Sequence, residues 1–425
     1  MSARPPIPPG PYLIVGLARS GKAAARLLHE RGEQVIAVDV GAPPAMEALA
    51  AQGVELHLGD DGLAQLERAG AVVKSPGVPA QAPVIAAARA RGLPVLGELE
   101  LAWRLLPNEL IAVTGTNGKT TTVELIGHIH REAGLPVAVA GNVGTALSGL
   151  VGTIDERATV VCETSSFQLE DAREFAPETA VLLNITPDHL DRHGTFAAYR
   201  AAKLRIFAHQ REGDVAVLPE ALADVELRLG VRRVYFDADP RPAITGLRLR
   251  GEHNRRNALA AAAVCLTRGI DPDAVGEGLR TFGGVPHRLQ EVGCRDGVVY
   301  VNDSKATNVA STLMALRAFP QGGVHLILGG QSKDQDFVPL REAVAASCRR
   351  VYLIGEDAPQ IAAALAGAGA PLRECGDLER AVAAASRAAN EGETVLLSPA
   401  CASFDQFADF EARGERFVVL VAGVV

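Results

Sequence analysis

The sequence predicts an α/β protein made of three consecutive domains, and three observations support this fold class. The chain has 425 residues, which is enough for about three domains of ordinary size. Short apolar runs alternate with longer amphipathic runs, as in strands and helices that build parallel sheets. A glycine turn at residues 115–118 follows a buried apolar run, where a strand would pass into a helix. We place the domains at residues 1–97, 98–284 and 285–425.

The first domain is predicted to be a Rossmann-like parallel sheet. Four strands are expected, within the segments PYLIVGLARSGK, EQVIAVDV, VELHLG and AVVKSPGV. Ligands of such sheets bind beyond the carboxyl ends of the strands. The residues expected there, as a site for a nucleotide or its diphosphate, are Arg19, Ser20, Asp39, Ser75 and Gly77. Ala18 replaces the second glycine of the G-x-G-x-x-G signature, so NAD is the weaker alternative.

The segment IAVTGTNGKTTT, residues 111–122, indicates a phosphate-binding loop that opens the central P-loop-like domain. Backbone amides of a glycine turn and the N-terminus of a helix both attract phosphate. Lys119 can reach the terminal phosphates, and the hydroxyl of Thr120 or Thr121 can bind Mg²⁺. The spacing G-x-x-G-K-T is shorter than the standard motif, and an ordinary turn remains the alternative. The predicted nucleotide-binding residues are Gly115, Thr116, Asn117, Gly118, Lys119, Thr120 and Thr121.

Three further residues of this domain are candidates for the same site. Glu163 ends a buried strand and can face Mg²⁺, although it could also simply terminate that strand. His189 lies in a polar cluster that could bind Mg²⁺ or zinc, but no zinc-ligand spacing is present, and a loop histidine without a role is the alternative. Asn257, near the start of a predicted helix, could meet a nucleotide base or cap the helix.

Lysine is scarce, and this makes each lysine informative. Only six of the 42 basic residues are lysines, namely Lys22, Lys74, Lys119, Lys203, Lys305 and Lys333. Arginine replaces lysine readily on a surface, but not where a compact charge or a modifiable amine is needed. Lys203 stands in the segment YRAAKLRIF, where arginine would serve equally well as a solvated charge. We therefore expect site roles for Lys119, Lys203, Lys305 and Lys333, whereas Lys22 and Lys74 only flank the loops of the first domain.

The third domain is again predicted to alternate strands and helices. Strands are expected in VVYVNDSKATN, GVHLILGGQSKDQDF, RRVYLIG and ETVLLSPACASFDQF, and the last helix is expected to begin between Phe404 and Phe410. Polar and ionisable residues follow three of these strands, among them Asp303, Lys305 and Lys333. Such residues at one edge of a sheet predict a binding face.

Composition excludes several classes of partner. Aromatic residues make up 4% of the chain, the net charge is −8 and no basic run occurs, which argues against nucleic acid. No apolar run is long enough to span a membrane. Six dispersed cysteines without a C-x-x-C pair indicate reduced thiols in a cytoplasmic protein. We expect a monomer.

Together these motifs resemble the Mur ligase family, the ATP-dependent amide-forming enzymes of peptidoglycan precursor synthesis. The resemblance rests on GTNGKTTT, GNVG, ETSSFQLE, NITPDHLDRHG, YRAAKLRIF, HNRRN, NDSKATN, GGQSKDQDF and LLSPACASFDQF, which occur in family order. GTNGKT alone is shared with folylpolyglutamate synthetases. ETSSFQLE, NDSKATN and SPACASFDQF resemble the members that add D-glutamate to UDP-N-acetylmuramoyl-L-alanine.

The resemblance implies a role for each motif residue. It implies a uridine-diphosphate domain, an ATP domain and an amino-acid-docking domain that close before an acyl phosphate forms. Catalytic roles fall to Lys119, Glu163, His189, Lys203 and Lys305, and two Mg²⁺ ions would be held by Thr120, Glu163, His189 and a carbamylated Lys203. Asn142 and Ser165 would contact the muramoyl-alanine part, Asn257 adenine, and Arg288 and Asp303 the ATP phosphates. D-Glutamate would be held by Thr307, Lys333, Ser403 and Phe410.

Four alternatives remain open at this point. The chain could be another Mur ligase or a folylpolyglutamate-type ligase, which an amino-acid panel would separate. It could be a nucleotide-switch protein, although no N-K-x-D motif for guanine follows the phosphate loop. A nicotinamide-dependent oxidoreductase is the fourth.

Overall fold

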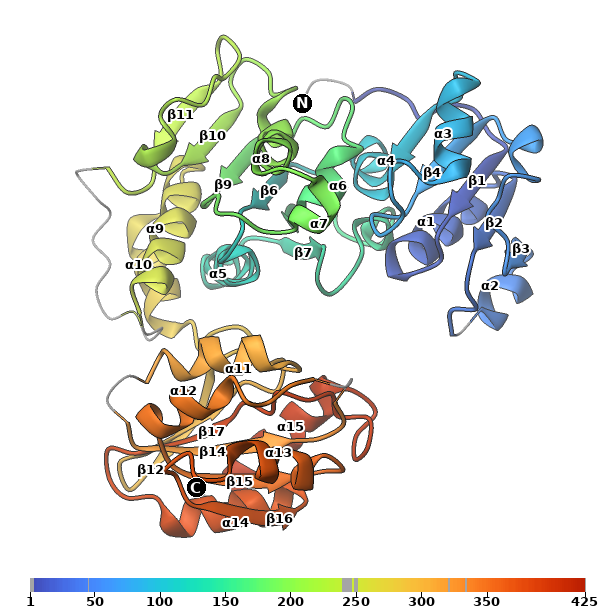
Figure 1. The fold of residues 1–425 in the computed structure, drawn as a ribbon. Coiled ribbons are helices and arrows are strands. Elements are labelled where there is room, and N and C mark those ends of the chain that lie inside the picture. The colour runs from blue at the N-terminus through green and yellow to red at the C-terminus, as the bar shows by residue number, and fades with distance from the viewer. Residues whose placement is uncertain are drawn as a thin grey trace. The chain divides into compact units, whose positions relative to one another are not determined.

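The computed structural model describes residues 4–44, 46–238, 247, 251–319, 322–332 and 335–424, and it contains three β-sheets (Figure 1). The chain divides into two compact units. The larger unit comprises Met1–Leu247 and Glu252–Arg280, and the C-terminal unit comprises Arg248–Gly251 and Thr281–Val425. The first two sheets belong to the larger unit and the third sheet to the C-terminal unit.

The first sheet is parallel, with strand order β3-β2-β1-β4-β5. Its strands are β1 (Tyr12–Val15), β2 (Val35–Asp39), β3 (Glu55–Leu58), β4 (Ala71–Lys74) and β5 (Val95–Gly97). Its helices are α1 (Arg19–Glu30), α2 (Glu47–Ala51), α3 (Pro83–Ala90) and α4 (Glu98–Leu105), with a 3-10 turn at Leu66–Arg68. Side chains of α1 and α4 pack on one face and those of α3 on the other. The strand order reverses between β1 and β4, which is where such sheets bind ligands.

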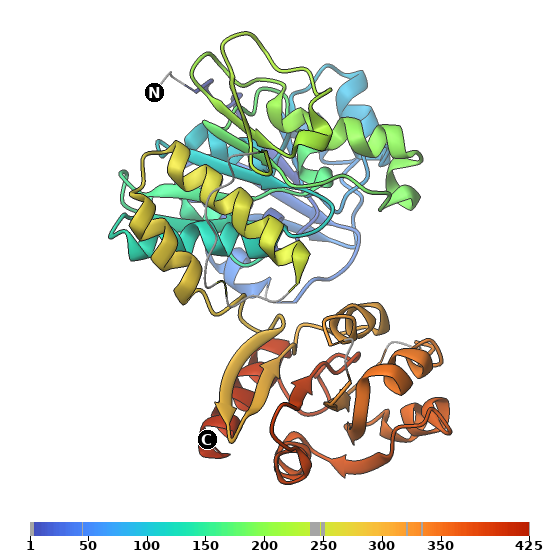
Figure 2. The same ribbon diagram turned by 90° about the vertical axis from the view of Figure 1, so that its left-hand side faces the viewer.

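The second sheet is also parallel, in the order β11-β10-β9-β6-β8-β7. Its strands are β6 (Leu110–Thr114), β7 (Val137–Gly141), β8 (Thr159–Glu163), β9 (Thr179–Leu182), β10 (Val215–Leu218) and β11 (Arg232–Tyr235). The helices of this part are α5 (Lys119–Glu132), α6 (Ser166–Glu170), α7 (Leu190–His193), α8 (Phe196–Leu204), α9 (Glu252–Thr267) and α10 (Pro272–Thr281), with 3-10 turns at Leu147–Leu150, Arg205–Phe207 and Glu220–Leu222. Helices α5, α9 and α10 pack together, and Gly278 of α10 lies directly against Ile129 of α5 (Figures 1 and 2).

The third sheet has the order β12-β13-β17-β14-β15-β16, and only its edge strand β12 runs antiparallel to its neighbour. Its strands are β12 (Gln290–Arg295), β13 (Val298–Asn302), β14 (Val324–Gly329), β15 (Cys348–Ile354), β16 (Leu372–Gly376) and β17 (Thr394–Leu397). Its helices are α11 (Val309–Leu316), α12 (Leu340–Ser347), α13 (Ala358–Leu365), α14 (Leu378–Ala388) and α15 (Phe410–Val424). Helices α11 to α13 cover one face, and α14 and α15 cover the other.

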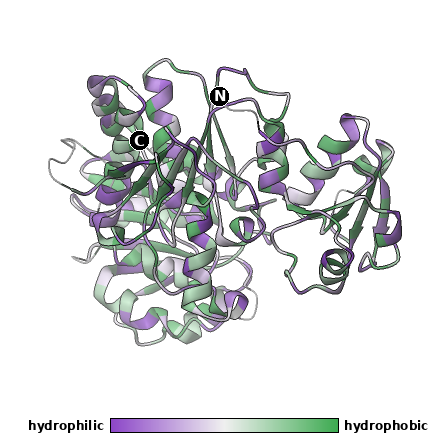
Figure 3. Cartoon of the chain, turned by 90° about the horizontal axis from the view of Figure 1, so that it is seen from above, coloured by the Kyte–Doolittle hydropathy of each residue, from purple (hydrophilic) through white to green (hydrophobic). Residues whose placement is uncertain are grey.

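The central strands are buried along their whole length and mostly apolar because helices cover both faces of each sheet. All residues of β6 (LIAVT) and β14 (VHLILG) are buried, as the pattern of a covered parallel sheet requires. Colouring by hydropathy shows the strands mostly green, whereas the helices carry both colours (Figure 3). The apolar runs of the sequence therefore predicted the central strands correctly.

The structure refines one expectation about secondary structure and adds strands that were not expected. The last helix begins at Phe410, the end of the predicted range, because the preceding residues are bound to other loops: the Asp405 carboxylate accepts the Glu356 amide at 3.1 Å. Asp409 then caps the helix by accepting the Ala412 amide at 2.7 Å. The first sheet has five strands where four were expected, because the three-residue strand β5 is too short to mark an apolar run. The edge strands β12 and β16 were also not predicted, since most of their side chains are exposed or only partly buried.

Candidate active site

The phosphate-binding loop lies at the carboxyl end of β6, in the middle of the second sheet. Gly118 has a φ of +86°, and helix α5 begins directly after it. The Lys119 ammonium group folds back over the loop and donates to the carbonyl oxygens of Gly115 and Thr116, at 3.0 Å each. The glycine turn, the helix N-terminus and the lysine predicted from the sequence are thus brought together, in an arrangement that suits a polyphosphate.

Asn257 lies directly on this loop. A Cβ atom added at Gly118 would come within 2.2 Å of the Asn257 Oδ1 atom, so glycine is required there by space as well as by its positive φ. Asn257 is buried and accompanied by Asn254, whose Oδ1 accepts its amide at 3.4 Å. The structure places Asn257 at the phosphate loop, and its contact with adenine stays a prediction.

A hydroxyl and a carboxylate meet beside the loop. Thr120 donates its hydroxyl hydrogen to Glu163 at 2.7 Å, and Asn142 donates to the other Glu163 oxygen at 3.0 Å. Glu163 ends β8, the neighbour of β6, and is only 3% exposed. Oxygen ligands of this kind are those that Mg²⁺ prefers. The residues present therefore fit Mg²⁺, and Thr120 is the threonine that faces Glu163.

Lys203 is buried against the same loop. Its ammonium group donates to the Gly115 carbonyl oxygen at 2.8 Å and lies 4.7 Å from the centre of the Tyr199 ring. Burial lowers the pKa of Lys203 from 10.5 to about 7, and the positive charge of Lys119 adds to this effect. A substantial fraction of the amine is therefore neutral near pH 7, and only a neutral amine can react with an electrophile.

His189 lies close to these groups but is more exposed. It precedes α7 with a left-handed backbone (φ +50°), and its ring lies 4.9 Å from the Phe167 ring and 6.3 Å from the Tyr199 ring. Tyr199, which the sequence reading missed, also hydrogen-bonds Thr116 of the phosphate loop at 3.1 Å. Among the described residues, no three His, Cys, Asp or Glu side chains form a group that could hold a metal ion.

The residues predicted for the uridine nucleotide gather at the β1–β4 switch point. A Cβ on Gly21 would come within 1.8 Å of the Gly16 carbonyl oxygen, so the first and third glycine positions of the signature keep their packing role. Ser20 follows β1, and Ser75 and Gly77 follow β4. The Asp39 carboxylate accepts the amides of Leu17 at 2.6 Å and Gly41 at 2.8 Å, and so holds the turn after β1.

Arg19 and Asn142, two further residues predicted to bind the uridine-linked substrate, connect the first sheet to the second. Arg19 donates to the carbonyl oxygen of Asn142, and Asn142 in turn bonds Glu163. Ser165 caps helix α6 in a capping box with Gln168. The larger unit therefore brings Arg19, Asn142 and Glu163 into one chain of contacts, whereas the ligand roles of Arg19, Asn142 and Ser165 stay predictions.

The C-terminal unit has its own polar cluster at the carboxyl ends of β13 and β17. Asp303 accepts the Leu289 amide at 3.1 Å and the Ser398 hydroxyl at 2.8 Å, and burial raises its pKa to about 7. The Lys305 ammonium lies 5.5 Å from the Phe410 ring centre. Ser403 is buried, and its hydroxyl has no hydrogen-bond partner among the described residues.

The remaining predicted residues of this unit are less constrained by contacts. Arg288 is exposed, and its positive charge lowers the pKa of Asp303 slightly. The burial of Asp303 has the larger, opposite effect on that pKa. Thr307 is half-buried in the same loop as Lys305. Lys333 lies outside the described residues.

Arg413 is a buried residue of this unit that was not predicted from the sequence. It is 1% exposed and donates to the carbonyl oxygens of Ser304 and Cys401 at 2.9 and 3.0 Å.

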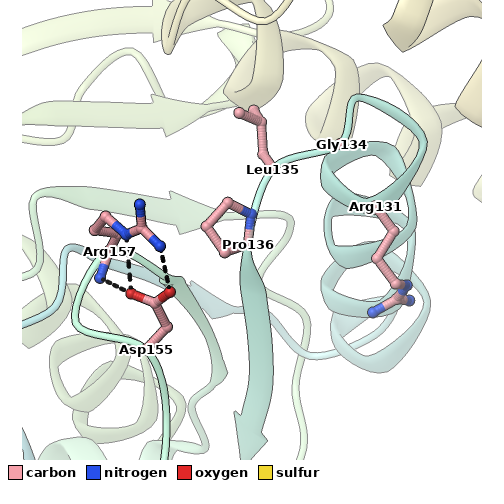
Figure 4. Close-up of a pocket in the computed structure, with 6 residues that line it drawn as sticks. All are labelled: Arg131, Gly134, Leu135, Pro136, Asp155 and Arg157. Carbon is pink, nitrogen blue, oxygen red and sulfur yellow. Dashed lines mark hydrogen bonds and ion pairs between the residues drawn. The ribbon is translucent and has the colours of Figure 1, made fainter.

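A separate surface pocket of about 630 Å³ lies at the other end of α5 (Figure 4). It is lined by residues of the last turn of α5, of the connection from α5 to β7 and of the loop before β8, namely Arg131, Gly134, Leu135, Pro136, Asp155 and Arg157. Helix α5 has 14 residues, so its ends are roughly 20 Å apart. This pocket is therefore not part of the phosphate site, which lies at the start of the helix.

The fold and the site define a nucleotide-binding α/β enzyme whose phosphate loop adjoins a hydroxyl–carboxylate pair and a titratable lysine. The chain belongs to the Mur ligase family. Models of three domains match it: the Mur ligase MurD-like N-terminal domain at residues 11–97, the Mur ligase middle domain at 113–229, and the Mur ligase glutamate ligase domain at 287–401.

Similar proteins cover almost the whole chain. UDP-N-acetylmuramoylalanine--D-glutamate ligase of Acidobacterium capsulatum is 42% identical, over 96% of this chain and 95% of that protein. The protein of the same name from Myxococcus xanthus is 44% identical, over 96% and 97%. Among solved structures, UDP-N-acetylmuramate-alanine ligase of Thermotoga maritima covers 98% of this chain and 100% of its own with a TM-score of 0.57, and at 20% identity it supports the fold alone.

Family membership removes two of the four alternative functions that the sequence left open. It excludes the nucleotide-switch protein and the nicotinamide-dependent oxidoreductase. The three α/β domains are confirmed, whereas their exact boundaries and the monomeric state stay predictions. No helix in the described parts of the chain is long and apolar enough to cross a membrane.

Proposed function

We propose that the protein is an ATP-dependent ligase that joins D-glutamate to UDP-N-acetylmuramoyl-L-alanine in peptidoglycan precursor synthesis. The observation that carries this proposal is 42–44% identity, over at least 95% of both chains, to proteins of that named activity. The geometry supports it: a buried Thr120–Glu163 pair and a titratable Lys203 lie beside a phosphate loop. Six cysteines without disulfides agree with a cytoplasmic location.

The reaction needs a carboxylate to be made electrophilic. The terminal phosphoryl group of ATP passes to the carboxylate oxygen of the alanyl group, which gives ADP and an acyl phosphate. The amine of D-glutamate then attacks the acyl carbon, a C–N bond forms, the C–O bond to phosphate breaks, and orthophosphate leaves with loss of a proton from the amine. Bound Mg²⁺ supplies positive charge to the phosphoryl oxygens during transfer.

Residues of the larger unit would bind the nucleotide and the metal ions. The Lys119 ammonium group, already directed over the loop, would exchange its two carbonyl acceptors for phosphate oxygens. Thr120 and Glu163 would hold one Mg²⁺, and His189 a second. Asn257 would remain against the loop and Asn142 beside Glu163. These roles agree with the donor chemistry of each side chain.

Lys203 is proposed to act as a carbamate. Its neutral amine nitrogen would attack CO₂, a C–N bond would form and one proton would be released, leaving a carboxylate-like group on a buried side chain. The low pKa of Lys203 supports this step because the neutral amine is populated near pH 7. The carbamate would add a negative ligand for the second Mg²⁺, which an arginine could not provide.

Residues of the C-terminal unit would hold the incoming amino acid. Ser403, with a buried hydroxyl that has no partner in the described structure, is suited to one carboxylate of D-glutamate. Lys333 would supply a positive charge for a D-glutamate carboxylate, and Thr307 and Phe410 would complete this site. Lys305, whose ammonium lies 5.5 Å from the Phe410 ring centre, would act on the reacting groups. Arg288 and Asp303 would contact the ATP phosphates.

Product mass tests the proposal directly. Purified protein would be incubated with UDP-N-acetylmuramoyl-L-alanine, ATP, Mg²⁺ and D-glutamate, and released phosphate would be measured in parallel. One glutamyl group should be added for each phosphate released. L-Glutamate, D-alanine and L-lysine serve as controls for the choice of amino acid. Phosphate release without added mass, or equal activity with any of these controls, would contradict the proposal.

A further inference from the structure

Arg192 connects the first sheet of the larger unit to the segment that carries His189. It lies on α7 (Leu190–His193), and its backbone amide donates to the His189 carbonyl oxygen at 3.2 Å. Its guanidinium group donates to three successive carbonyl oxygens in the turn after β4: those of Pro76 at 3.4 Å, Gly77 at 3.2 Å and Val78 at 3.0 Å. One side chain thus holds a turn that sequence and topology assign to the uridine nucleotide.

The same guanidinium group is fixed on the side of the second sheet. It lies 3.3 Å from the Glu170 carboxylate, and its central carbon lies 5.1 Å from the centre of the Phe167 ring. The Arg192 side chain is only 14% exposed. A planar group with five N–H donors can serve three carbonyls and a carboxylate at once, whereas a lysine ammonium cannot reach all of them.

The Phe167 ring is shared between Arg192 and the two histidines of this segment. Its centre lies 4.9 Å from the His189 ring and 5.5 Å from the stacked His193 ring. His193 is itself fixed, because its Nδ1 lies 3.1 Å from Glu170 and its Nε2 lies 3.0 Å from the Ser166 hydroxyl. Helix α7 is therefore held on α6 at several points, and a shift of Arg192 would be transmitted to His189.

We infer that Arg192 is a positioning residue that couples binding of the uridine-linked substrate at the turn 75–78 to the placement of His189 beside the phosphate loop. The inference rests on the proposed function, in which His189 would hold the second Mg²⁺. Binding of the nucleotide part at the turn would set α7, and α7 would set the His189 imidazole. Each substrate would then strengthen binding of the other through one shared arrangement.

The coupling can be measured by calorimetry on the full chain. The dissociation constant of UDP-N-acetylmuramoyl-L-alanine is determined with and without Mg²⁺ and a non-hydrolysable ATP analogue, in the native protein and in Arg192→Gln and Arg192→Lys. We expect the native ratio to be about 10-fold, within the usual range for coupled sites, and to fall toward 1 in Arg192→Gln. Arg192→Lys should retain an intermediate ratio, and thermal melting shows whether each variant is folded.

A matched control is Arg200→Gln. Arg200 lies on α8 near the same region and pairs only at the surface, with Asp224 at 2.7 Å. This variant should keep the native ratio. The inference is overturned if the native protein shows no coupling, or if folded Arg192→Gln or Arg192→Lys keeps the full native ratio. Failure of the proposed function is a different result, because the native protein would then form no product in the mass assay.

Discussion

Replacing Lys203 tests the chemistry on which the site depends. In Lys203→Ala we expect the ligase rate to fall by about 100- to 1,000-fold, the usual cost of losing one stabilising group in an active site. Small carboxylic acids such as formate or acetate should restore part of the rate, because the Ala variant leaves space where the carbamate would stand. Lys203→Arg should be as inactive as the Ala variant without being rescued, since the guanidinium fills that space.

The magnitude of the pH effect follows from the pKa of Lys203. With a pKa of about 7, roughly three quarters of the amine is neutral at pH 7.5, against about 0.1% for a lysine at its ordinary 10.5. At pH 6 the neutral fraction falls to about 9%, an eightfold decrease. In degassed buffer, activation by added bicarbonate should therefore become slower and less complete as the pH falls from 7.5 to 6.

The assay is phosphate release at saturating ATP and D-glutamate, with and without bicarbonate. The matched control is Arg200→Ala, which removes a surface cation from the same helix and should leave the rate unchanged. Full activity of folded Lys203→Ala would refute the carbamate. So would a bicarbonate effect that is the same at pH 6 and pH 7.5, because the response must follow the neutral amine.

Three further changes test other parts of the structure. Glu163→Gln should raise the Mg²⁺ concentration needed for half the maximal rate and lower the rate by about 100-fold, or about 2.7 kcal/mol, and an unchanged Mg²⁺ titration would contradict a metal role. Lys74→Met removes the partner at 2.7 Å from the buried Asp171 carboxylate and leaves only the longer contact with Arg89 at 3.5 Å, so it should cost about 3 kcal/mol in urea unfolding, and adding Asp171→Leu should recover much of this loss. The folded state keeps Asp303 protonated up to a pKa of about 7, so it binds more protons than the unfolded chain between about pH 4 and 7, and stability must fall as pH rises through that window. Asp303→Asn should remove this pH dependence, worth up to about 4 kcal/mol, which thermal melting from pH 4 to 8 would detect.

Local sequence patterns predicted the central strands and the phosphate loop because both depend on neighbouring residues. The glycine turn, Lys119 and the apolar run before them are adjacent in the chain. Exposed edge strands such as β12 were missed because pairing with β13, not an apolar run, makes them strands. The hydroxyl partner of Glu163 could only be narrowed to two threonines, since the choice of Thr120 depends on how β8 and α5 are placed.

Contacts between distant segments could not be predicted from the sequence. Arg192 and the turn after β4 are more than 100 residues apart, and nothing in either segment indicates their contact. Arg413 is another case, because one buried guanidinium group binds loops that follow β13 and β17. The last helix also carries Glu411, Glu415 and Arg416, so its sequence does not single out Arg413 as the buried charge.

A comparison of three buried cations, Arg413, Lys74 and Lys203, shows when a lysine in this lysine-poor chain indicates a chemical role. Arg413 is satisfied by several carbonyl oxygens in a fork, and burial lowers its pKa only to about 10, so it remains charged. Lys74 is also buried, but the adjacent carboxylate of Asp171 compensates its charge. Lys203 instead donates to one carbonyl oxygen, that of Gly115. The repulsion by Lys119 adds to the effect of burial, which the Asp188 and Glu163 carboxylates offset only in part. Among these three buried cations, Lys203 is the one whose surroundings favour a neutral, reactive amine. Scarcity indicates that a lysine is constrained, and burial that outweighs the nearby carboxylates indicates that its amine can react.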